Sequence, residues 1–167
     1  MDREVVLPDV LARGLKVVFC GSAAGRRSAE LGAYYAGPGN RFWPLLHALG
    51  LTTRLLRPEE FRHVLDCGIG LTDLAKKVSG ADGALPKGSD DPDALKERIL
   101  SFAPKVLAFN GKRPAEAFLG HKAAYGLQPD TVGEATIFVL PSTSRANARF
   151  AAEAAAWHDL ARYLESL

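Results

Sequence analysis

Two short apolar runs, each ending in a loop of small or polar residues, constrain the fold of this chain more than any other feature. Residues 16–20 (Lys-Val-Val-Phe-Cys) lead into Gly21-Ser22-Ala23-Ala24-Gly25, and residues 136–140 (Thr-Ile-Phe-Val-Leu) lead into residues 141–149. A short continuous apolar run is typical of a strand that is buried on both faces of a parallel sheet. The carboxyl ends of such strands form the ligand crevice of an open α/β sheet. We therefore expect both loops to contribute to one binding site.

The remaining segments favour the same architecture. A further apolar run covers residues 105–110, residues 125–128 are a weaker strand candidate, and helical patterns separate the strands. Helices are expected over residues 40–49, 58–67, 92–102, from 114 onward and 150–164, and the Gly-, Ser-, Pro- and Asp-rich residues 78–91 predict an exposed loop. The pattern predicts an α/β fold: a three-layer α/β/α sandwich with a central, mostly parallel four-stranded sheet, in a single domain over residues 1–167.

Composition argues against several classes of protein. Hydrophobic residues make up 47% of the chain and charged residues 24%, which is typical of a globular protein without a membrane span. Acidic residues and a proline among the first ten residues do not fit a secretory signal. Cys20 and Cys67 do not form a CxxC pair, which argues against a zinc ribbon and favours a reducing cytoplasm. The four histidines lack the spacing of metal ligands, so we expect no metal and no other cofactor.

The positions of the charges are more informative than their sum. A net charge of +2 is too small to require a nucleic-acid partner. Basic residues nevertheless gather at or just after the expected strand and loop ends, where they can form a local basic face; the alternative is scattered, solvated charge. Ser142, Thr143 and Ser144 add hydroxyl groups that can contact phosphates. The basic residues concerned are Arg26, Arg27, Arg41, Lys112, Arg113, Arg145 and Arg149, of which Lys112 and Arg149 are further candidates for phosphate contacts.

Several segments occur in the order found in a known enzyme family. The first loop lacks a Walker A or GxGxxG pattern, but Tyr34-Tyr35 and Asn40-Arg41-Phe42-Trp43 follow it. With these and the later segments, the chain resembles the mismatch-specific uracil/thymine DNA glycosylases of the uracil-DNA glycosylase superfamily over about residues 5–165. The resemblance implies the fold of that superfamily and hydrolysis of the N-glycosidic bond of a flipped-out base. The later segments are Gly68–Leu74, Phe109–Lys112 and Leu140–Ala148.

The resemblance also implies a base pocket, formed by Gly21, Ser22, Ala23, Tyr35 and Asn40. Backbone N–H groups around Gly21 and Ser22 would stabilise the negative charge of the departing base. Tyr35 would stack on the flipped base, although a purely structural role in the core is an alternative.

The chain departs from the family at the position of the Asn that usually orients the attacking water. Ala23 stands there, and its side chain cannot hydrogen-bond a water. Asp73 is our candidate for the transferred role, because a carboxylate can accept a proton from water and favour positive charge on the sugar. The alternatives are that Asp73 caps a helix, that Asp66 or Ser22 has the role, or that activity is lost.

The second loop differs as well. The resemblance places Ala146 at the position that fills the gap left by the flipped base, and alanine fills little space. Arg145 before it and Asn147 after it are the alternatives for this wedge.

These observations predict a monofunctional DNA glycosylase that removes uracil and other deaminated or mismatched bases and starts base excision repair. We expect uracil to be preferred over thymine, double-stranded DNA containing uracil or mismatches as the partner, single-stranded DNA as a further partner, and a cytoplasmic monomer. The alternative is a catalytically weak or inactive protein of the same fold that binds damaged or mismatched DNA. A small-molecule α/β hydrolase is disfavoured because no Gly-x-Ser-x-Gly motif is present.

Overall fold

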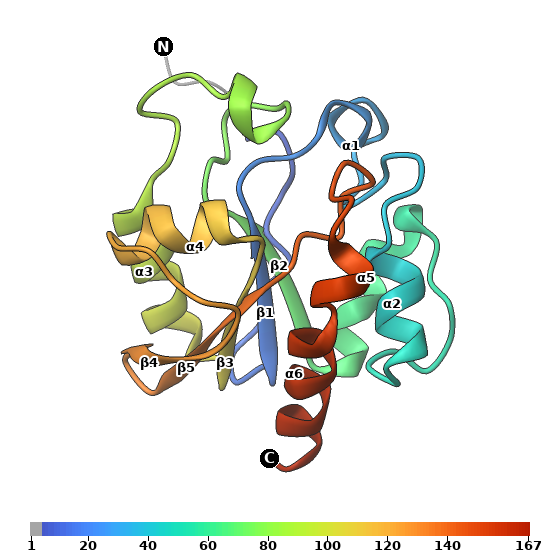
Figure 1. The fold of residues 1–167 in the computed structure, drawn as a ribbon, viewed down its shortest axis with the longest axis vertical. Helices are drawn as coiled ribbons and strands as arrows, with labels where there is room; N and C mark the ends of the chain where they lie inside the picture. Colours follow the sequence, from blue (N-terminus) through green and yellow to red (C-terminus); the bar gives the residue numbers. More distant parts are fainter. Residues whose placement is uncertain (1–4) are drawn as a thin grey trace.

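The computed structural model describes residues 5–167 and has helices on both faces of a central sheet (Figure 1). The predicted α/β architecture is confirmed, but the sheet has five strands instead of four, in the order β2-β1-β3-β5-β4. Four strands are parallel, and β4 pairs with β5 in the antiparallel sense. The strands are β1 (Val17–Gly21), β2 (Ile69–Asp73), β3 (Val106–Asn110), β4 (Gly126–Val132) and β5 (Ala135–Leu140).

The strand missing from the sequence-based prediction is β2. Its residues, Ile-Gly-Leu-Thr-Asp, lack the continuous apolar run of the other parallel strands. Tertiary contacts make it a strand: it pairs with β1 on one side, and Leu71 exchanges two backbone hydrogen bonds with Val10 on the other. Gly70 permits this close approach, because a Cβ there would lie 2.7 Å from the carbonyl oxygen of Val10. The glycine that obscured the strand in the sequence is thus required by its packing.

Alternate residues of β1, β3 and β5 enter two separate cores. Val17 and Phe19 of β1 face one core, which includes buried residues of α2, η1 and α6, whereas Val18 and Cys20 face the other, which includes residues of α3 and α4. Figure 1 shows α3 and α4 on one side of the sheet and α2, α5 and α6 on the other. The helices are α1 (Arg26–Leu31), α2 (Phe42–Ala48), η1 (Pro58–Cys67), η2 (Asp82–Ala84), α3 (Pro92–Phe102), α4 (Lys112–Leu119), α5 (Phe150–Glu153) and α6 (Ala155–Glu165), η marking 3₁₀ helices.

Two helix predictions are refined by the structure. Asn40 was expected near the start of a helix, and its Oδ1 accepts a hydrogen bond of 3.0 Å from the backbone N–H of Phe42, the first residue of α2. The single helix expected over residues 150–164 is divided at Ala154 into α5 and α6. The indole Nε1 of Trp157 donates to the carbonyl of Pro141 and so ties α6 to the loop after β5. Within residues 5–167, none of the helices has the length and apolar character needed to cross a membrane.

Candidate base-binding site

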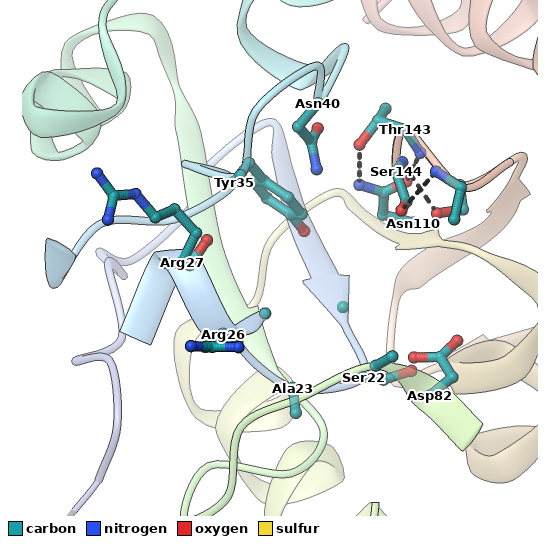
Figure 2. Close-up of a pocket in the computed structure, with 18 of the residues that line it drawn as sticks. Ser22, Ala23, Arg26, Arg27, Tyr35, Asn40, Asp82, Asn110, Thr143 and Ser144 are labelled. Atoms are coloured by element: carbon teal, nitrogen blue, oxygen red, sulfur yellow. Dashed lines mark hydrogen bonds between the residues drawn. The ribbon is translucent and has the colours of Figure 1, made fainter. Parts of the chain in front are cut away.

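The parallel strands end together, and a cavity of about 480 Å³ opens at this carboxyl edge of the sheet. Both strand-end loops line it, as the sequence predicts. Figure 2 shows Tyr35, Asn40, Asn110 and Thr143 around one part of the cavity and Ser22, Ala23 and Asp82 around another. Of the predicted site residues, those lining the cavity are Gly21, Ser22, Ala23, Tyr35, Asn40, Asp73, Ser142, Thr143, Ser144, Arg145, Ala146 and Asn147.

Asp73 is a buried carboxylate at the end of β2, directly opposite Gly21 of β1. Only 4% of the residue is exposed. Burial raises the pKa of Asp73 from 3.8 to about 6; the positive charges of Lys76 and Arg98 lower it, whereas the negative charge of Asp9 raises it. Because Asp73 ends a strand, the alternative that it caps a helix is wrong. Its carboxylate is ionised at neutral pH and can accept a proton near the cavity.

Gly21 leaves room for the carboxylate of Asp73 and the hydroxyl group of Tyr35. A Cβ at this position would lie 3.0 Å from Oδ1 of Asp73 and 3.4 Å from the hydroxyl oxygen of Tyr35. Both side chains therefore reach the space directly above the end of β1. Any larger residue would displace the carboxylate, the phenol or both.

Two buried hydroxyl groups at the cavity have no hydrogen-bond partner within the described residues 5–167: Ser22 Oγ and the Tyr35 hydroxyl. Burial raises the pKa of Tyr35, and the charge of Asp73 acts in the same direction, whereas the nearby side chain of Asn110 lowers it; the net shift is upward, so the phenol stays protonated. A buried hydroxyl without a partner is costly, and a ligand that accepts hydrogen bonds would remove that cost.

The ring of Tyr35 is held by both stacking and backbone conformation. It stacks on Phe42 with the ring centroids 4.0 Å apart and the planes at 24°. Its φ of +53° lies in the left-handed region, which is unusual for a residue other than glycine. The structure thus makes Tyr35 an outer layer of the aromatic core that also lines the cavity.

The loop after β5 is anchored to the rest of the site through Thr143. Asn110, at the end of β3, donates from Nδ2 to Thr143 Oγ1 at 2.9 Å and accepts from the Thr143 backbone N–H at 3.0 Å. The backbone N–H of Arg41 donates to the carbonyl of Thr143, and its guanidinium donates to the carbonyl of Ser144 at 2.8 Å. Thr143 is fully buried, so its role is to fix the loop and not to contact phosphates from the surface.

The tip of this loop presents Arg145. The Asn147 side chain folds back into the loop, donating to the carbonyl of Ser142 and accepting from the backbone N–H of Arg149. Arg145 is exposed, and its aliphatic stem lies against Gly39, where a Cβ would be only 2.8 Å from Cδ of the arginine. Ala146 is also exposed but is small.

Two predicted phosphate contacts lie outside the cavity lining. The ammonium group of Lys112 lies 4.3 Å from the ring centroid of Tyr125. The guanidinium of Arg149 pairs with Glu153 at 2.8 Å, near the start of α5. Both side chains are exposed, and neither lines the cavity.

The site has no metal-ion centre among the residues that the structure describes. Across residues 5–167, no three His, Cys, Asp or Glu side chains are grouped so that they could hold an ion. The charged residues at the cavity are Asp73 in its interior and Arg26, Arg27, Asp82 and Arg145 around it. Such a cavity can hold a polar, neutral ring and has cations near it for phosphate groups.

Comparison with known proteins assigns this chain to a family. A sequence model of the uracil DNA glycosylase superfamily matches residues 8–161. The chain belongs to the uracil DNA glycosylase superfamily. A candidate uracil DNA glycosylase of Methanosarcina acetivorans, solved by solution NMR, has a similar structure, with a TM-score of 0.62 and 26% sequence identity over 95% of this chain and 96% of that one. The superfamily acts on DNA, so the chain is, at family level, a DNA glycosylase with DNA as its partner.

Several residues of this glycosylase site were not predicted from the sequence. Asn110 ends a buried strand, as Gly21 and Asp73 do, and that position was the available signal. Asp82 begins the short 3₁₀ helix η2, in a segment without a distinctive sequence pattern, and the backbone pairing of Ser79 and Gly80 with Ala24 brings this segment to the cavity. Asp66 is exposed on η1 and does not line the cavity, so the structure offers no support for its catalytic role.

Proposed function

We propose that this protein is a monofunctional DNA glycosylase that flips uracil out of double-stranded DNA and hydrolyses its N-glycosidic bond. The observation that carries the proposal is the buried carboxylate of Asp73 in a cavity that also contains the unpartnered hydroxyls of Ser22 and Tyr35. Membership of the superfamily supports the reaction class. The mismatch-specific substrate range is part of this proposal.

In the proposed reaction, the flipped base lies along Tyr35 and its polar edge faces the hydroxyl and amide groups of the cavity. As the N-glycosidic bond breaks, the sugar gains positive charge and the base leaves as an anion. The ionised Asp73 stabilises the positive charge and accepts a proton from the water that attacks C1′ of the sugar. Backbone N–H groups of residues 21–25, with the hydroxyl of Ser22, stabilise the anionic base until solvent protonates it.

Ala23 is the feature that favours a second candidate, a protein that binds damaged DNA without cutting it. Its methyl group lines the cavity, at the position where the resemblance to the glycosylases implies an asparagine. We favour catalysis because Asp73 supplies an ionisable group that can take over the role of a water-orienting asparagine. Binding of DNA is common to both candidates.

For DNA binding, we propose that Arg145 enters the gap left by the flipped base while Ser142 and Ser144 contact the neighbouring phosphates. The exposed position of Arg145 and the internal hydrogen bonds of Asn147 support this choice between the two wedge candidates. Lys112 and Arg149 would contact phosphates farther along the duplex. We further propose that the protein is a cytoplasmic monomer with a single domain and that it needs no cofactor. Single-stranded DNA is proposed as a weaker partner than the duplex.

The experiment is single-turnover base release from a duplex with one uracil opposite guanine. We expect release by the wild type, a loss of at least about 100-fold in Asp73→Asn, as is typical for a general base, and an unchanged rate in Asp66→Asn. Uracil should exceed thymine by only about 10- to 200-fold, because a single methyl group is rejected weakly. Duplex binding without release of uracil, thymine, hypoxanthine or xanthine would establish the non-cutting candidate instead.

A further inference from the structure

A network of charged side chains lies next to Asp73, outside the cavity. The proposed reaction does not use this network directly. We propose that Asp9, Lys76 and Arg98 are positioning residues that hold Asp73 in place and keep its carboxylate ionised. The inference rests on the proposed function in giving Asp73 its catalytic role.

Asp9 is the centre of the network. Its Oδ1 accepts a hydrogen bond of 2.7 Å from the hydroxyl of Thr72 and lies 2.9 Å from Nζ of Lys76. Its Oδ2 lies 3.5 Å from Nε of Arg98. Thr72 immediately precedes Asp73 in β2, and side chains alternate between the two faces of a strand. The network therefore holds the strand residue next to Asp73 from the opposite face.

Arg98 and Lys76 connect this network to two segments that carry residues of the cavity. Arg98, on α3, donates from a terminal nitrogen to the backbone carbonyl of Asp73 at 3.0 Å. Lys76 donates to the hydroxyl of Tyr34 at 3.0 Å, and that hydroxyl donates to the carbonyl of Pro8. Tyr34 precedes Tyr35, so the same three charges act on the backbone at Asp73 and on the segment that carries the pocket tyrosine.

The charges balance only when Asp73 is ionised. Two carboxylates, Asp9 and Asp73, then face two cations, Lys76 and Arg98. The side chains of Lys76, Arg98 and Asp9 are only 11%, 19% and 27% exposed, so solvent and salt screen them less than surface pairs. Protonation of Asp73 would leave the group with a net positive charge, so the two cations offset part of the desolvation that raises the pKa of Asp73.

The other titratable groups around Asp73 do not supply charge. The pKa of Cys20, of Tyr34 and of Tyr35 is raised by burial in each case, with a further contribution from the charge of Asp73. They therefore stay neutral at physiological pH. Lys76 and Arg98, which lower the pKa of Asp73, and Asp9, which raises it, are the charged groups that act on the carboxylate.

The test is a ¹³C NMR titration of the Asp73 carboxyl carbon, which does not depend on activity. Lys76→Met should raise the titration midpoint by about 1 pH unit, Lys76→Arg should restore it, and Asp9→Asn should lower it. Lys77→Met is the matched control, because Lys77 is exposed and the neighbouring residue in sequence, and it should leave the midpoint unchanged. A purely structural role would not give shifts of opposite sign.

Unchanged midpoints in both Lys76→Met and Asp9→Asn would overturn the proposal, and if one variant does not fold, the other decides. The pH dependence of the single-turnover rate gives the second measurement. The acid limb of this profile should move with the titration midpoint of Asp73, so that a shift of one pH unit changes the rate at pH 5 by about tenfold. Opposite shifts in an enzyme without base release would refute the proposed function but retain the network. Base release by the wild type, together with unchanged Asp73 titration midpoints in the variants, would refute the role of the network alone.

Discussion

Replacing Asp73 by asparagine should stabilise the protein at neutral pH while removing its proposed activity. The carboxylate is buried at the end of β2 with no side-chain ion pair of its own among the described contacts, and burial is the main reason that its pKa is raised. Asparagine has nearly the same shape but cannot ionise. The substitution therefore removes the cost of burying a charge and leaves the packing of the cavity almost unchanged.

The magnitude follows from the pKa of Asp73. A rise from 3.8 to about 6 is about 2 units, and each unit corresponds to about 1.4 kcal/mol, so the wild type loses about 3 kcal/mol of unfolding free energy. A carboxyl group with a raised pKa in the folded state costs nothing below pH 3.8, where it is protonated in both states. The cost grows as the pH rises from about 4 to 6 and is complete above pH 7.

Urea denaturation followed by the fluorescence of Trp43 and Trp157 measures this difference at pH 4 and pH 8. We expect Asp73→Asn to exceed the wild type by about 2 to 3 kcal/mol more at pH 8 than at pH 4. Asp66→Asn, which alters an exposed carboxylate, should show no such pH-dependent difference. A stability difference that is equal at the two pH values would refute the argument, since it would show that Asp73 is not titrating near pH 6.

Three further predictions concern the reaction, the loop and the DNA interface. Single-turnover base release should fall about tenfold per pH unit below about 6, because protonated Asp73 cannot accept a proton; a flat profile from pH 5 to 8 would contradict this. Asn110→Ala should lower the unfolding free energy by about 2 to 4 kcal/mol in urea denaturation, because it removes both bonds to the buried Thr143; a loss under about 1 kcal/mol would count against that anchoring role. Arg145→Ala should weaken duplex binding and reduce the slope of log K against log salt by about 1, whereas Arg162→Ala on α6 should change neither; an unchanged slope for Arg145→Ala would remove this residue from the interface.

The parts of the fold that could be predicted are those with strong local patterns. The residues of β1, β3 and β5 are continuous apolar runs, and all three proved to be central parallel strands. The start of α2 was also predictable, because Asn40 lies next to the N-cap residue, Arg41, and accepts the Phe42 N–H. β2 was missed because it contains a glycine and two polar residues, and its strand conformation depends on β1 and Val10 at its two edges.

The candidate site was predictable to the same extent. Loops at the ends of parallel strands had to lie at one edge of the sheet, so the residues of both loops were found from the sequence. Asn110 had the same positional signal but no motif that assigned it a role. Asp82 had no signal at all, because an exposed loop between distant elements carries no periodicity that indicates where it folds.

By itself, the sequence determined three of the buried strands, the loops that follow them, and that the side chain at position 23 is a methyl group, which cannot hydrogen-bond a water. Only the tertiary structure decided that Asp73 is a buried carboxylate beside Gly21 and Tyr35, with its pKa raised to about 6. The same is true of the contact between Asp9 and Thr72, which are 63 positions apart. Hydrophobic periodicity is a local property of the chain. Desolvation and the pairing of charges depend instead on which groups, distant in sequence, the fold buries close together.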